Sequence, residues 1–181
     1  MASINLNWKW LYWSYGFTWA NDLLPQILEN GLKENQLDRS VYVIRLNGPF
    51  AIQYPYRATS LLYIGEGNFK QRINSHTKGW LNDLWEIIEN HGLTIGVATP
   101  RVRNNLSAYK DVEAALIHEF SNLYGTAPIN NKQYEYSRLD HNFEVKELRE
   151  ALTIGRGIKH KWAISPMKAN KFYHHYHRTH V

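Results

Sequence analysis

Residues 63–76 carry the sequence YIGEGNFKQRINSH, and an apolar run, SVYVIRL, precedes them at 40–46. The segments 41–46 and 61–64 are rich in β-branched and aromatic residues, which predicts two short strands. Glycines at 65 and 67 predict a turn after the second strand. Asn68 is a suitable helix N-cap with Gln71 three residues later, so a helix is expected to begin there. The stretch therefore predicts two strands, a turn and a helix in succession.

The remaining elements complete an α+β domain. Apolar residues at helical spacing indicate helices over 21–32, 80–90, 111–124 and 143–152, and 93–99 is typical of a third strand. We expect a small three-stranded sheet, mixed or antiparallel, flanked by helices. The segment 47–60 forms a long insertion between the first two strands, which either carries substrate contacts or only extends the hairpin.

The two ends of the chain have unusual compositions. Four of the seven tryptophans lie within 4–19, and we expect this segment to pack on the core rather than stack on nucleic-acid bases. Residues 151–181 hold six Lys or Arg and no Asp or Glu, which favours a basic arm that contacts phosphates over a merely solvated tail. The predicted organisation is an extension over 1–39, a core domain over 40–131, and a helix with a basic, His-rich arm over 132–181.

Composition argues against several classes of protein. The chain has no cysteine, which removes a disulfide framework and any Cys-based zinc site. No apolar run approaches the ~20 residues that a membrane helix needs, and the first residues lack the order of a secretory signal. We therefore expect a cytoplasmic protein with no membrane partner.

The motif at 63–76 resembles that of the GIY-YIG nuclease family. Residues 63–65 repeat the family's second triplet, and Val41-Tyr42 stands where the first triplet has Ile-Tyr. Arg72 and His76, which share one helix face at i, i+4, occupy the positions of the family's helix arginine and of a histidine found in some branches. A Pro-x-x-Asn sequence at 128–131 matches the end of the domain. The departures are that Ser40 replaces the first glycine, that 47–60 interrupts the hairpin, and that the gap from Tyr63 to Arg72 is one residue shorter than is common.

This resemblance implies hydrolysis of phosphodiester bonds with one divalent ion, Mg²⁺ or Mn²⁺. Tyr42 and Tyr63 are expected to position or deprotonate the attacking water, with His76 assisting. Arginine grips phosphate oxygens in two places and stays charged, so Arg72 is expected to stabilise the transition state. Asn131, or Asn130, is expected to supply the last polar contact of the catalytic set.

The expected metal ligand is Glu113. Its sequence context, Glu-x-x-Leu-Ile, matches the family's pattern, and one carboxylate is chemically sufficient for Mg²⁺. Glu119 is the alternative, because it lies 12 residues before Asn131, a spacing that some members show.

Several further residues are expected to contact the substrate. The two glycines leave the strand end free of side chains, so that backbone N–H groups can approach a phosphate. The full set of expected substrate contacts comprises Gly65, Gly67, Lys70, Asn130, Lys159 and Lys161.

The function expected from the resemblance is a DNA endonuclease of the restriction or defence type. A structure-specific nuclease and a toxin-type nuclease are alternatives, and RNA is left open as a substrate. A nucleic-acid-binding module without turnover is the alternative of another class. Cutting both strands usually calls for two copies of a one-site domain, so a homodimer is also considered.

Overall fold

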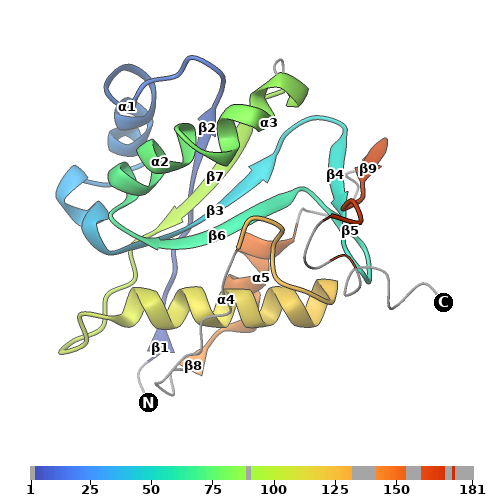
Figure 1. Cartoon of the computed structure of the whole chain (residues 1–181). Helices are drawn as coiled ribbons and strands as arrows, with labels where there is room; N and C mark the ends of the chain where they lie inside the picture. Colours follow the sequence, from blue (N-terminus) through green and yellow to red (C-terminus); the bar gives the residue numbers. More distant parts are fainter. Residues whose placement is uncertain (1–2, 89–90, 132–141, 154–159, 170–172, 174–181) are drawn as a thin grey trace.

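The computed structural model describes residues 3–88, 91–131, 142–153, 160–169 and 173 (Figure 1). Its central sheet has four antiparallel strands in the order β2-β7-β3-β6. These strands are β2 (Lys9–Trp13), β3 (Ser40–Leu46), β6 (Leu61–Gly67) and β7 (Leu93–Ala98). The α-helices are α1 (Leu24–Glu29), α2 (Phe69–Thr77), α3 (Trp80–Ile88), α4 (Ala108–Tyr124) and α5 (Val145–Leu152). The predicted α+β class is confirmed.

Helices cover both faces of the central sheet. Figure 1 shows α1, α2 and α3 over one face and α4 and α5 over the other. Strand β3 is buried along its whole length, as expected of a strand with apolar neighbours on both sides. Strand β6 lies at one end of the sheet, so its outer edge faces the space between the two helical layers.

The expected number of strands is wrong by one. The fourth strand, β2, comes from the aromatic N-terminal segment and pairs with β7 at the end of the sheet opposite to β6. Leu11 and Trp13 point into the core, whereas Tyr12 between them is exposed. Because aromatic side chains stand on both faces of this strand, its period of two was hidden. The expectation that the segment packs on the core is borne out by its buried side chains.

Several predicted elements differ only at their ends. The helix expected over 21–32 is a π-helical turn, Trp19–Leu23, followed by the short α1, with Pro25 in its first turn. A 3-10 helix, Glu34–Arg39, then leads into β3. The helix predicted from residue 143 begins instead at Val145, after a two-residue strand, β8 (Asn142–Phe143), which pairs in parallel with β1 (Ser3–Ile4).

The insertion 47–60 builds most of a second sheet. It forms β4 (Phe50–Gln53) and β5 (Ala58–Thr59), which pair antiparallel, and β9 (Trp162–Ile164) adds to β4 in parallel. This three-stranded sheet therefore joins the insertion to a segment more than 100 residues later in the chain. The insertion thus extends the hairpin into a separate small sheet.

A buried arginine connects the central sheet to α5. Arg45 of β3 is 8% exposed and donates to the carbonyls of Glu150, Ala151 and Thr153 at the end of that helix. Its guanidinium also lies 4.6 Å from the centre of the Trp10 ring. Burial lowers the pKa of Arg45 to about 10, so it remains a cation at neutral pH. A cation at this position complements the negative end of the helix dipole.

The outer edge of β6 is covered by side chains and by the loop after α4. The Tyr54 hydroxyl donates to the Leu61 carbonyl over 2.8 Å and accepts from the Ile129 N–H over 3.1 Å. The Asn130 N–H donates to the Leu62 carbonyl. The Asn131 side chain accepts from the N–H of Ile64 at 3.0 Å and donates to its carbonyl at 2.7 Å. The loop at 129–131 therefore supplies the partners that a further strand would otherwise provide.

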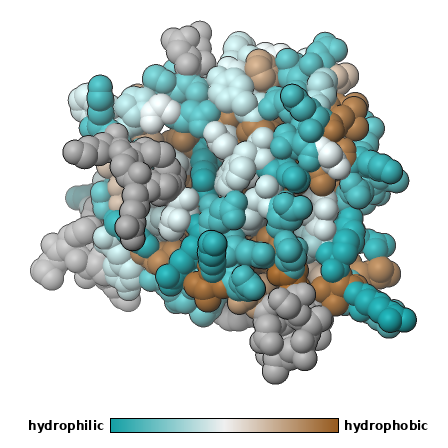
Figure 2. Space-filling view, turned by 180° about the vertical axis from the view of Figure 1, so that it is seen from behind, coloured by the Kyte–Doolittle hydropathy of each residue, from teal (hydrophilic) through white to brown (hydrophobic). Residues whose placement is uncertain are grey.

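One face of the molecule is mostly hydrophilic. Figure 2 shows that on the face behind that of Figure 1 hydrophilic side chains predominate among the coloured residues, with hydrophobic ones in small groups. No helix in the described parts of the chain is long and apolar enough to cross a bilayer.

Replacing Tyr54 with Phe removes one hydroxyl that bridges two backbone groups of the edge. We expect a loss of about 1–3 kcal/mol in the free energy of unfolding, because buried polar groups are left without that partner. Urea unfolding measures the change. Tyr56→Phe is the matched control, since Tyr56 is 59% exposed, and a change below about 0.5 kcal/mol is expected there. Equal stabilities of the two variants would contradict the bridging role.

Candidate active site

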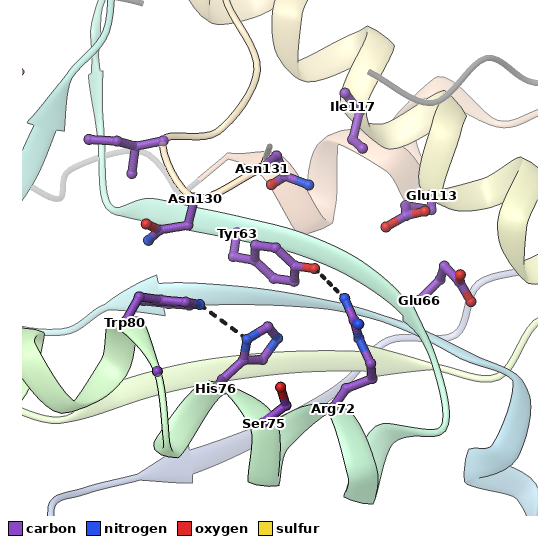
Figure 3. Close-up of a pocket in the computed structure, with 12 residues that line it drawn as sticks. Tyr63, Glu66, Arg72, Ser75, His76, Trp80, Glu113, Ile117, Asn130 and Asn131 are labelled. Atoms are coloured by element: carbon purple, nitrogen blue, oxygen red, sulfur yellow. Dashed lines mark hydrogen bonds between the residues drawn. The ribbon is translucent and has the colours of Figure 1, made fainter. Parts of the chain in front are cut away.

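A pocket of about 630 Å³ opens where the edge of β6 meets α2 on one side and α4 on the other (Figure 3). Its walls come from β6, α2, the start of α3, α4 and the loop after α4. The residues that line it are Tyr63, Glu66, Arg72, Ser75, His76, Gly79, Trp80, Glu113, Ile117, Ile129, Asn130 and Asn131. Segments that are distant in sequence thus bring cationic, acidic, phenolic and amide groups to one place.

The two tyrosines lie on the same face of the sheet. Tyr42 pairs with Gly65 across β3 and β6, so its ring and that of Tyr63 approach over the glycine, with centroids 5.9 Å apart. A Cβ at Gly65 would lie 2.4 Å from the Tyr63 ring and 2.7 Å from the Tyr42 hydroxyl oxygen. Gly65 therefore makes room for the phenols, and it does not line the pocket itself.

Only one of these phenols reaches the pocket. Tyr63 is among the lining residues, whereas Tyr42 is fully buried behind it, with its ring against Phe69. Burial raises the pKa of Tyr63, the charge and hydrogen bond of Arg72 oppose that rise, and the charge of Glu113 adds to it. Burial likewise raises the pKa of Tyr42. Both side chains are therefore neutral phenols at pH 7.

Arg72 reaches Tyr63 from α2. Its Nη2 donates to the Tyr63 Oη over 2.8 Å, as the dashed line in Figure 3 marks. The start of the helix is fixed by Asn68, whose side chain accepts from the Gln71 N–H at 3.0 Å, which confirms the predicted N-cap. Gly67 has a φ of +109° and makes the sharp passage from β6 into this helix. Gly67 therefore aims the helix rather than lining the pocket.

His76 lies one helical turn beyond Arg72 between two aromatic partners. Its Nε2 is 2.8 Å from the Tyr42 hydroxyl, and its Nδ1 accepts from the Trp80 indole N–H at 3.1 Å. Its ring also packs on Tyr63 with centroids 4.6 Å apart. Burial, followed by the charge of Arg72, lowers the pKa of His76 to about 4. The imidazole is consequently neutral at physiological pH.

Carboxylates face the arginine across the pocket. Glu113 of α4 lines it and is 5% exposed, and Glu66 at the end of β6 lies beside it in Figure 3. Glu119, the alternative ligand, is not among the lining residues, and its carboxylate accepts from Arg149 over 2.8 Å. Six residues of helix separate the two glutamates, which sets them on different faces. The structure thus brings Glu113, and not Glu119, to the pocket.

These carboxylates fit a divalent ion of the Mg²⁺ type. Carboxylate oxygens are the donors that Mg²⁺ prefers, and this ion keeps several waters and takes oxygens from a bound phosphate. The described part of the chain contains no cluster of three or more His, Asp or Glu side chains. The donor set is therefore too small for a closed structural site but sufficient for an ion shared with a substrate.

The asparagines have different positions. Asn130 lines the pocket with its side chain, as expected of a substrate contact. Asn131 also lines it, but both ends of its amide are used on the Ile64 backbone, so it holds β6 in place. Asn131 is therefore better described as a positioning residue than as a catalytic one.

Neither Lys70 nor Lys161, both expected to contact the substrate, is among the residues that line the pocket. Lys70 is on α2 but forms an ion pair with Glu34 over 3.1 Å, and its ammonium lies over the Trp19 ring. Lys161 is exposed next to β9, with its backbone bonded to Pro49. Lys159 lies outside the described residues. That Lys161 contacts a phosphate stays a prediction, and it applies to a nucleic acid long enough to extend beyond the pocket.

Among the pocket residues that were not predicted as functional are Glu66, Ser75 and Trp80. Glu66 could have been suspected, because a charged residue directly follows the triplet at the end of a strand. Ser75 lies three residues after Arg72 and so shares its helix face, which is also visible from spacing. Trp80 gave no such indication, since its place depends on how α3 turns back against α2.

Comparison with known proteins does not assign the chain to a family. No protein-family model, no curated protein and no solved structure matches it. The functional argument therefore depends on the motif and on the geometry of the pocket.

The pH dependence of stability tests the environment of His76. Its pKa falls from 6.5 in the unfolded chain to about 4 in the fold, so the unfolded state binds the extra proton in this range. The free energy of unfolding should fall as the pH drops from 6.5 towards 4, by up to about 1.4 kcal/mol per pH unit from this one group. Denaturant titrations at several pH values measure the slope.

The variant for this test is His76→Gln, which removes the titration. The free energy of unfolding of this variant should change less steeply with pH between pH 4 and 6.5 than that of the natural chain. The difference should approach about 1.4 kcal/mol per pH unit, which corresponds to one proton. His118→Gln, at an exposed position of α4, is the control and should keep the original slope. If His76→Gln also keeps the slope of the natural chain, the conclusion that His76 is buried in its neutral form is wrong.

Proposed function

We propose that this protein is a metal-dependent endonuclease of the GIY-YIG type that hydrolyses phosphodiester bonds in DNA. The observation that carries the proposal is the pocket itself: Tyr63, Arg72 and Glu113 come from three elements and line one cavity. A phenol, a guanidinium and a carboxylate around a common space can position a water, bind a phosphate and hold a divalent ion, which are functions that phosphodiester hydrolysis uses. The motif's Tyr63 lies on β6, and its Arg72 and His76 lie on the following helix α2, which is the order that the resemblance to the family implies.

Arg72 is the group proposed to bind the scissile phosphate. Its side chain is exposed to the pocket at the same time as it holds the Tyr63 oxygen. A guanidinium carries five N–H donors, so one bond to a phenol leaves capacity for a two-point grip on phosphate oxygens. Charge accumulates on these oxygens as water attacks phosphorus, and a fixed cation stabilises that state.

Tyr63 is proposed to hold the attacking water. Its oxygen is the phenolic oxygen at the pocket, next to the arginine that would hold the phosphate. The water oxygen forms a bond to phosphorus, the ester oxygen leaves with the bonding pair, and the proton of the water passes to Tyr63 when this residue is a phenolate, or to solvent when it is a phenol. The raised pKa of Tyr63 means that its phenol orients the water at neutral pH. Its phenolate becomes available as a base as the pH rises.

The carboxylate wall is proposed to bind the divalent ion, Mg²⁺ or Mn²⁺. Glu113 is the principal ligand, and Glu66, which lines the same pocket, is proposed to add a second contact. Such an ion, when bound, offsets the developing negative charge and assists the leaving oxygen. A nucleic-acid-binding module without turnover would not need a buried carboxylate opposite the phosphate-binding arginine, so this alternative is weaker.

The proposed substrate is duplex DNA, with a restriction or defence role. The basic character of residues 151–181 suits contact with the backbone on either side of the cleaved bond. Lys161 is the described residue of that region proposed for such a contact. Because the domain has one site, two copies of the chain are proposed to act together when both strands are cut. The proposed location is the cytoplasm.

Cleavage by matched variants tests the function. Purified protein with plasmid DNA and Mg²⁺ or Mn²⁺ should nick or cut, and Arg72→Ala and Glu113→Gln should each lower the rate by about 100-fold or more, because each removes transition-state stabilisation. Glu119→Gln is the control, since this residue of the same helix faces Arg149. It should cleave at the rate of the natural chain.

Two outcomes would overturn the proposal. Equal cleavage by all four proteins would identify a contaminating nuclease. Salt-dependent binding of DNA and of RNA oligonucleotides, with no cleavage of either in any divalent metal, would favour the binding module instead. Measuring oligonucleotide binding in parallel separates a loss of chemistry from a loss of affinity.

A further inference from the structure

The tautomer of His76 follows from its neighbours. An indole nitrogen is a donor only, so the contact of Trp80 Nε1 with His76 Nδ1 requires that Nδ1 carries no proton. A neutral imidazole has one proton, which must then be on Nε2. That nitrogen lies 2.8 Å from the Tyr42 hydroxyl oxygen, so His76 donates and Tyr42 accepts.

The direction of this bond fixes the next one. Because the Tyr42 oxygen accepts from His76, its own O–H points to another acceptor. The Tyr63 side chain stands on the same face of the sheet, with its ring centroid 5.9 Å from that of Tyr42. Its hydroxyl oxygen is the acceptor that this arrangement offers to the Tyr42 O–H.

Two donors then meet at one atom. The Tyr63 oxygen accepts from Arg72 over 2.8 Å, and in this arrangement it also accepts from Tyr42. Two donors at a phenolic oxygen stabilise its anion relative to the same phenol in an apolar site. They oppose the effect of burial at the residue proposed to orient the water.

We infer that Trp80 is a positioning residue: its indole N–H holds His76 in the Nε2–H tautomer, which orients Tyr42 towards the Tyr63 oxygen. The ring of Trp80 stands at the pocket wall, where Figure 3 shows its nitrogen directed at His76. His76 with both nitrogens used in this way does not take the proton of the attacking water. Its contribution is to orient the phenols, which revises the assisting role expected from the sequence.

The structural part of this inference stands apart from the nuclease proposal, whereas its catalytic consequence rests on that proposal. The test is long-range ¹H–¹⁵N NMR of the full-length protein at pH 7, which distinguishes protonated from unprotonated imidazole nitrogens. In the natural chain His76 should show a protonated Nε2 and an unprotonated Nδ1. A protonated Nδ1 would overturn the inference without any variant.

Trp80→Phe keeps an aromatic ring but removes the donor. The His76 signals should then move towards a mixture of the two tautomers, whereas Trp162→Phe, at an exposed position of β9, should leave them unchanged. An unchanged tautomer in folded Trp80→Phe would overturn the role of the indole. Given cleavage by the natural chain, kcat should fall about three- to tenfold at constant KM, the effect of one hydrogen bond. Absence of cleavage by the natural chain would count against the nuclease proposal and leave the NMR result to stand by itself.

Discussion

The unpaired outer edge of β6 is the constraint on which the rest of the site depends. A strand at the end of a sheet presents backbone groups that must find partners, and water cannot serve a buried edge. In this protein the partners are the Tyr54 hydroxyl and the amides of the loop at 129–131. The same bonds hold the loop after α4 against the sheet. Closing the edge without another strand therefore leaves a pocket between α2 and α4.

Within that pocket, glycines decide where the functional groups lie. Gly65 permits two phenols to meet over one strand position, and Gly67 permits the strand to turn directly into the helix that carries Arg72. Neither needs to touch a substrate for this role. The fold itself therefore requires glycine at both positions, whether or not a ligand is bound. A side chain at Gly65 would displace Tyr42 and Tyr63.

The sequence predicted the local elements better than their assembly. The strands at 41–46 and 61–64 and the N-cap at Asn68 follow from local preferences, and the structure has them. The fourth strand was missed because aromatic residues on both of its faces hide the alternation. Glu113 was preferred over Glu119 as the metal ligand because of its Leu-Ile context, and in the structure Glu113 lines the pocket whereas Glu119 pairs with Arg149. The roles of Trp80 and Asn131 depend on tertiary contacts with α2 and β6, which no local pattern contains.

The proposed function requires that one pocket bind both a divalent ion and the phosphate of a nucleic acid. Crystals grown with Mn²⁺ and a short DNA duplex test it most directly, because the anomalous signal of manganese locates the ion independently of the protein. The account predicts an ion in contact with the Glu113 carboxylate and a backbone phosphate on the Arg72 guanidinium. An ion bound away from Glu113, or DNA with no phosphate within reach of Arg72, would contradict it.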